Sequence, residues 1–284
     1  MANDDSAESS GHSPDSADPS VRPNLVVVAL VGIAAGALGG LFGVGGGLII
    51  VPGLVLVVKL DRRLANGTSL AATLPIALAS LSTYVYNGNV DLAVAGLLTV
   101  GTVVGAVIGT TLLTILPKRT ITIVFTVTIL ATAIRLFTTT ETTGRADLTV
   151  TIGVMLVIIG VAAGTLSGLL GVGGGVVLVP AMIVTLGMVP VVAKGTSVAV
   201  IVPTSLVGTI QNNKTAYVDF RVAGVAGSCG AIVAVIGGTI ADGISTPVSN
   251  TLFALLLLFV AATQVVTLRS DRRADIAAAS SVLG

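Results

Sequence analysis

Residues 36–52 read GALGGLFGVGGGLIIVP, and residues 164–180 read GTLSGLLGVGGGVVLVP. Both stretches belong to a longer internal repeat, because residues 36–92 align with residues 164–220 at a constant offset of 128 without a gap. Identical residues occupy 20 of the 57 aligned positions. A register kept over this length indicates that one structural unit has been duplicated.

The composition is that of a membrane protein. Hydrophobic residues make up 54% of the 284 residues and charged residues only 10%, whereas soluble domains carry about 25% charged residues. A single cysteine, Cys229, excludes an internal disulfide, and the only histidine, His12, lies in the polar N-terminal stretch. The sequence therefore predicts no metal site, no cofactor and no nucleic-acid partner, and it predicts a lipid bilayer as the surroundings of the chain.

We expect an all-α, polytopic transmembrane bundle of two homologous repeats with eight to ten membrane segments, some of them broken at glycines. The uncertainty in the count comes from the first two segments of each half. These segments are short for a bilayer crossing, which needs about 20 apolar residues, and they form either a tight hairpin of short helices or a re-entrant pair. The expected segments are 25–42, 45–60, 65–86, 92–116 and 119–138 in the first half, and 149–170, 173–189, 195–212, 221–241 and 247–268 in the second.

The domain division follows from these segments. We expect a disordered acidic tail, a first transmembrane repeat, a polar loop, a second transmembrane repeat and a C-terminal tail. Both tails are predicted to be cytoplasmic, and the chain is predicted to lie in the plasma membrane. The ranges are 1–24, 25–138, 139–148, 149–268 and 269–284.

The basic residues favour inverted repeats over parallel ones. If the first two segments of each half return to the same side, eleven of the 14 Lys and Arg residues fall on one face and three on the other. Because basic loops stay in the cytoplasm, the first face is predicted to be cytoplasmic. The three on the opposite face are Arg135, Arg145 and Lys194.

The glycine blocks predict a binding site. Glycine costs about 1 kcal/mol in a helix relative to alanine, and broken backbone at membrane depth must be buried in protein or line a wet cavity. Matched breaks in two halves point to a transporter's substrate site, where exposed helix N-termini attract an anion. Close helix packing is the alternative explanation. The proposed ligands are Gly43, Gly45, Gly46, Gly47, Gly171, Gly173, Gly174 and Gly175.

Two further matched groups accompany the glycines. Residues 66–69 and 194–197 each precede an apolar segment, where Thr and Ser are ordinary helix caps or, together with Asn66 and Lys194, ligands of an anion. Lys194 either attracts the anion or meets water. The four matched prolines kink helices or act as hinges. The residues concerned are Asn66, Thr68, Ser69, Lys194, Thr196 and Ser197, with hinges at Pro52, Pro180, Pro75 and Pro203.

The doubled glycine-proline block, with Gly-Thr-Ser after each copy, resembles the TauE/SafE (sulfite exporter) family of membrane transporters. The resemblance covers most of residues 25–268 and implies transport of a small sulfur-containing anion such as sulfite, a sulfonate or thiosulfate. We therefore expect a secondary transporter that works by alternating access, with a coupling proton or cation left open. A passive anion channel and a non-transporting membrane scaffold are the rivals. An enzyme is not expected, because no apolar segment has Asp, Glu or His near its middle.

Overall fold

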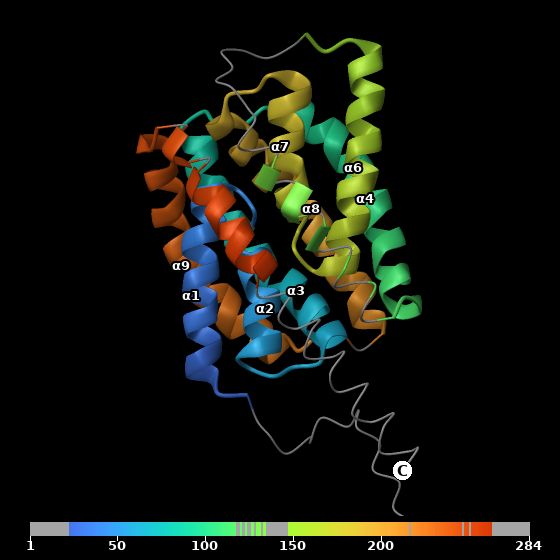
Figure 1. Cartoon of the computed structure of the whole chain (residues 1–284), viewed down its shortest axis with the longest axis vertical. Coiled ribbons are helices and arrows are strands. Elements are labelled where there is room, and N and C mark those ends of the chain that lie inside the picture. The colour runs from blue at the N-terminus through green and yellow to red at the C-terminus, as the bar shows by residue number, and fades with distance from the viewer. Residues whose placement is uncertain are drawn as a thin grey trace, which may run out of the picture.

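A computed structural model describes residues 23–117, 147–215, 217–245, 247–249 and 251–262, together with residues 120, 123, 126, 127, 129–131, 133 and 134. The predicted tails and the polar loop therefore lie outside the described residues, apart from residues 23, 24, 147 and 148. Within the described part every regular element is a helix, which confirms the all-α prediction (Figure 1).

The first half contains α1 (Leu25–Phe42), α2 (Gly47–Leu56), α3 (Arg62–Tyr86) and α4 (Leu92–Ile115). The second half contains α6 (Val150–Leu170), α7 (Gly175–Leu186), α8 (Pro190–Lys214) and α9 (Phe220–Gly243). Six of these helices are long and apolar enough to cross a bilayer, whereas α2 and α7 have only 10 and 12 residues. A rise of 1.5 Å per residue gives the short helices about 15–18 Å, roughly half of the hydrocarbon core.

Each glycine break thus joins one long helix to one short helix. This arrangement lies between the two alternatives predicted from the sequence, a hairpin of short helices and a re-entrant pair. The four matched prolines all lie inside helices, Pro52 in α2, Pro75 in α3, Pro180 in α7 and Pro203 in α8. Proline removes a backbone hydrogen bond from a helix interior. Neighbouring helices must therefore compensate for the backbone hydrogen bond that each proline removes.

The two halves pack through glycine contacts that recur 128 residues apart. A Cβ on Gly36 of α1 would lie 2.0 Å from the carbonyl oxygen of Gly230 in α9, and one on Gly164 of α6 would lie 2.2 Å from the carbonyl oxygen of Thr102 in α4. Such close backbone approach is typical of membrane helices with small residues at their interface. The heaviest helix contacts, α1 with α9 and α4 with α6, therefore join one half to the other.

Glycine contacts also give the helix directions. Gly101, Gly105 and Gly109 of α4 meet Val157, Val161 and Thr165 of α6 in ascending order, so α4 and α6 run parallel. The same ordering makes α1 parallel to α9. The loop of residues 87–91 turns the chain from α3 back into α4, and α2 folds back between α1 and α3. Hence α1 and α6 run in opposite directions, with α1 starting at the lower end of Figure 1 and α6 at the upper end.

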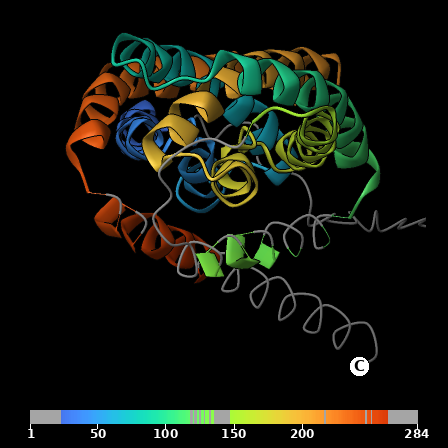
Figure 2. The same cartoon turned by 90° about the horizontal axis from the view of Figure 1, so that it is seen from above.

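The outer surface fits lipid. Exposed apolar residues recur along α4 at Val100, Val104 and Ile108, and along α9 at Ile232, Ile236 and Ile240. In Figure 2, α4 and α9 lie along one face of the molecule and the apolar helix of residues 247–262 lies along the opposite face. The two glycine breaks are enclosed between these faces. The membrane orientation of the two halves stays a prediction.

Candidate functional site at the glycine breaks

Both breaks use backbone conformations that favour glycine. Gly43 ends α1 with φ of 70°, Gly45 and Gly46 have φ of 70° and 84°, and α2 starts at Gly47. Residues other than glycine rarely adopt a positive φ, because their Cβ atom then comes too close to the backbone. The second break repeats this geometry, with φ of 71° at Gly171, 82° at Gly173 and 83° at Gly174.

The structure brings the two breaks into direct contact. A Cβ on Gly47 would lie 2.7 Å from the backbone of Val172, and a Cβ on Gly175 would lie 2.7 Å from the Cα of Val44. In the part of the chain that the structure describes, no side chain caps the start of α2 or of α7, so the first N–H groups of both helices lack a side-chain acceptor there. Two positive helix ends are therefore held together inside the bundle.

The meeting point is the middle of α3 and α8. Gly45 and Gly173 both lie against Thr73 and Ile201, with Cβ positions 3.0–3.4 Å from the side chains of these residues. The outer glycines take different neighbours: Gly43 lies against Lys194, and Gly171 lies against Asn66. The remaining pair, Gly46 and Gly174, face the carbonyl oxygens of Ala35 and Ala163 in the preceding long helices.

The polar groups at 66–69 and 194–197 lie inside helices, so the capping interpretation is wrong. Helix α3 begins at Arg62 with Asp61 as its N-cap, and α8 begins at Pro190 with Val189 as its N-cap. Charged residues at the water interface and a proline at the first helical position extend both helices beyond their apolar stretches. Meeting water is also wrong for Lys194, whose side chain is 3% exposed.

The buried groups from these segments have distinct partners. The Asn66 side-chain amide donates to the carbonyl oxygen of Leu169 at 3.0 Å, and the Ser69 hydroxyl donates to that of Gly171 at 2.8 Å. In the other half, Lys194 donates to the hydroxyl of Ser249. The hydroxyl of Ser197 has no hydrogen-bond partner among the described residues. The second break is therefore more fully bonded than the first.

A row of polar residues that the sequence analysis missed continues from these groups along α3 and α8. On α3, Thr73 and Ser80 follow Asn66 at intervals of seven residues, and on α8, Ser205 and Thr209 follow Ser197. Such spacing puts residues on one face of a helix. All four side-chain oxygens are buried and lack a hydrogen-bond partner within the described residues. Because an orphaned hydroxyl costs about 1–3 kcal/mol, this row is a candidate for binding a ligand that would accept its hydrogen bonds.

Comparison with known proteins identifies the family of the chain. The family described as "Sulfite exporter TauE/SafE" matches the chain over residues 7–136 and 156–283. The chain belongs to this family. It is 24% identical over 224 residues to the probable membrane transporter protein YunE of Bacillus subtilis (strain 168), covering 69% of this chain and 81% of that protein.

A second relative is a probable membrane transporter protein of Xylella fastidiosa (strain 9a5c), 25% identical over 246 residues, which cover 82% of this chain and 90% of that protein. No solved structure matches the chain. Family and relatives together make this a multi-pass membrane transporter, as the glycine-proline blocks indicated. A transporter family agrees with the expectation that the chain is not an enzyme.

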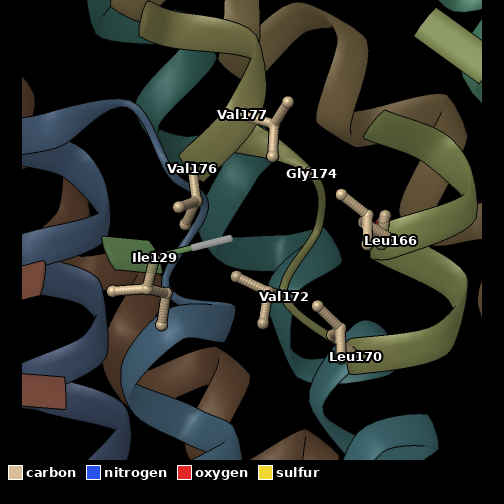
Figure 3. A pocket seen from close by; sticks show the side chains of 8 residues that line it. Ile129, Leu166, Leu170, Val172, Gly174, Val176 and Val177 are labelled. Carbon is tan, nitrogen blue, oxygen red and sulfur yellow. The ribbon is translucent and has the colours of Figure 1, made fainter. Parts of the chain in front are cut away.

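In this TauE/SafE member, apolar side chains cover the breaks on the side away from α3 and α8. Val44 and Val172 pack with Phe42, Ile129 and Leu257 in one buried cluster. Figure 3 shows Ile129, Val172 and Val176 around a pocket beside Gly174. Its volume of about 10 Å³ is close to the least that holds one water molecule. The described structure is thus closed around the breaks on this side.

Thr68 and Thr196 form hydrogen bonds with the residues that precede α9 and α4. The hydroxyl of Thr68 accepts the backbone N–H of Asp219 at 2.9 Å, and that of Thr196 accepts the backbone N–H of Asp91 at 2.9 Å. The two aspartates in turn accept backbone N–H groups at the starts of α9 and α4. Each threonine therefore fixes the start of a long helix from the other half.

The substitutions Thr68→Val and Thr196→Val should each destabilise the protein. Each leaves a partly buried N–H without its acceptor, a loss of about 1–3 kcal/mol, and thermal unfolding in detergent should show a lower midpoint. Thr239→Val is the control, because the exposed Thr239 hydroxyl bonds only within its own helix. If all three variants had the same midpoint of thermal unfolding, the two threonines would not stabilise the protein by fixing these helix starts.

Proposed function

We propose that this chain is a secondary transporter that moves a small anion by alternating access, with the two glycine breaks as its binding site. The observation that carries the proposal is the contact between the breaks at the midpoints of α3 and α8. Two helix starts without a side-chain cap lie at this place, and Thr73, whose buried hydroxyl has no partner within the described residues, contacts both breaks. Both kinds of group donate hydrogen bonds, which is the chemistry that an oxyanion requires.

The charge of the site supports an anion. Among the residues that the structure describes, Lys194 is the only buried charged side chain, and no buried carboxylate opposes it there. A buried cation in a membrane segment marks a substrate or ion pathway by default. The family description names sulfite, which supports sulfite or a related sulfur-containing anion, a sulfonate or thiosulfate, as the proposed substrate.

The packed breaks favour a carrier over an open channel. A carrier passes through a state in which its site is closed, and the breaks here touch through backbone atoms beneath an apolar cover. The repeats 25–138 and 149–268 would rock about the site, with Pro52, Pro75, Pro180 and Pro203 as hinges. A proton or cation gradient would supply the energy.

The ends of the bundle support a cytoplasmic location for the start of α1. The basic residues Lys59, Arg62, Arg63, Lys214 and Arg221 lie at helix ends on that side, where the hydrogen bond from Arg63 to the Leu116 carbonyl joins the start of α3 to the end of α4. Asp91 and Asp242 lie at the opposite end with Lys194. Positive residues concentrate on the cytoplasmic face, so the two halves are inferred to be inverted repeats.

Transport into proteoliposomes tests the function. We expect saturable uptake of at least one of sulfite, thiosulfate and methanesulfonate, with competition among them and stimulation by a proton or cation gradient. Chloride and sulfate serve as comparison anions, and empty liposomes give the leak. Flux that rises without saturation and never accumulates an anion would instead identify a channel. If correctly inserted protein transported none of these anions, the result would favour a non-transporting membrane scaffold.

A further inference from the structure

Lys194 links three elements at one end of the site. Its ammonium group donates to the hydroxyl of Ser249, which is 2% exposed and stands at the start of the apolar helix 247–262. The same nitrogen lies 5.8 Å from the centre of the Phe42 ring, at the end of α1. Phe42 stacks on Phe253 of the apolar helix, with ring centres 5.0 Å apart and an interplanar angle of 16°. The ammonium thus joins α8 and the apolar helix beside the first break.

The sequence of the other half differs at the matched positions. The residue matched to Lys194 is Asn66, which is neutral and bonds the backbone of α6. At the same offset of 128, position 121 has Ile where position 249 has Ser, and position 170 has Leu where position 42 has Phe. Within the described residues, a charged group therefore fastens the cover of the first break alone, although the backbone of both breaks is alike.

The fastening is weak for a buried charge. An ammonium has three donors and is strongly hydrated in water, and its hydrogen-bond partner among the described residues is a single neutral hydroxyl. Burial of a charge is costly unless it is paired. An arriving anion offers Lys194 a better partner than Ser249 does.

We propose that the transported anion opens its own gate by displacing Ser249 from Lys194, which frees the helix 247–262 from the end of α1. We call the contact between Lys194 and Ser249 the latch, and its role rests on the proposed function. The latch adds two details to that function: Lys194 recognises the anion first, and it does so at its own end of the molecule. The ligand class is a small oxyanion, held by the ammonium and then passed to the glycine break. Gly43, whose Cβ position lies 2.6 Å from the Cα of Lys194, is the next backbone on that path.

A tryptophan reporter tests the latch. The chain has no tryptophan, so Phe253→Trp places a single one at the stacked pair. Titration with sulfite, thiosulfate and methanesulfonate should shift its emission saturably to the red as the helix leaves the stack. If Phe253→Trp loses transport, Phe259→Trp on the same helix, 65% exposed, takes its place.

Two variants separate the parts of the latch. Lys194→Asn, which copies position 66, should abolish the emission response and raise KM at least tenfold. Ser249→Ala keeps the charge and removes the fastening, so it should shift the emission before any anion is added and keep KM within threefold of the parent.

The outcomes distinguish the latch from the function. Saturable transport with an emission that no anion changes would overturn the latch and leave the transporter standing. A structural role alone for Lys194 would lower the unfolding temperature of both variants equally without a change in KM, which would also overturn it. Failure of the parent protein to transport any anion would instead overturn the proposed function.

Discussion

The double variant Gly47→Ala and Gly175→Ala is expected to lose transport altogether and to unfold at a markedly lower temperature. Both glycines are the first residues of their helices and neither has a positive φ, so alanine brings no backbone strain of its own. Each new methyl group would instead stand 2.7 Å from the facing break, at Val172 or at Val44. Overpacking costs about 1–3 kcal/mol at each place. The breaks would have to separate, which removes the closed state that a carrier needs.

The chain supplies a matched control at Gly96 and Gly224, which are also related by the offset of 128. A Cβ at either position meets nothing within 4 Å. Alanine there should keep transport and raise helix stability slightly, because alanine is favoured over glycine in helices. The measurements are thermal unfolding in detergent and the initial uptake rate per folded molecule. A lower unfolding temperature with an unchanged rate would show that the breaks serve packing alone.

Much of the helix pattern could be predicted, because apolar length and glycine clusters are local signals. The predicted segment 25–42 coincides with α1, and 65–86 and 92–116 end within one residue of α3 and α4. Four glycines in five positions also marked the places where the backbone takes positive φ. Helix starts were less certain where Arg62 or Pro190 precedes the apolar stretch, because charge and proline belong to the first turn of the helix there.

The polar row along α3 and α8 could not be found by comparing the two halves. Thr73 aligns with Ile201 and Ser80 aligns with Gly208, so these hydroxyls have no matched partner in the repeat. Helical spacing from Asn66 and from Ser197 would have pointed to them. The partners of Lys194 were beyond reach for another reason, since Ser249 lies 55 residues away in sequence and only tertiary packing brings the two together.

The conservative change Thr73→Val is expected to reduce transport at least tenfold while leaving stability unchanged or higher. Valine keeps the shape of threonine and its contacts with Gly45 and Gly173. It removes only a hydroxyl that is fully buried and has no partner within the described residues. Replacing such a group by a methyl relieves a desolvation cost of about 1–3 kcal/mol. The transport rate should therefore fall while the stability stays the same or rises. Substitution of a purely structural residue would not produce this combination.

Thr111→Val provides the comparison, because the exposed Thr111 hydroxyl bonds the Val107 carbonyl of its own helix and faces away from the breaks. Its transport rate and unfolding temperature should stay near those of the parent protein. If Thr73→Val transports as fast as the parent protein, the polar row along α3 and α8 does not line the path of the anion. If it loses both stability and transport, the Thr73 hydroxyl supports the fold instead. A slower protein of unchanged or higher stability would support an anion between α3 and α8, because an anion there would need the hydrogen bond that valine cannot give.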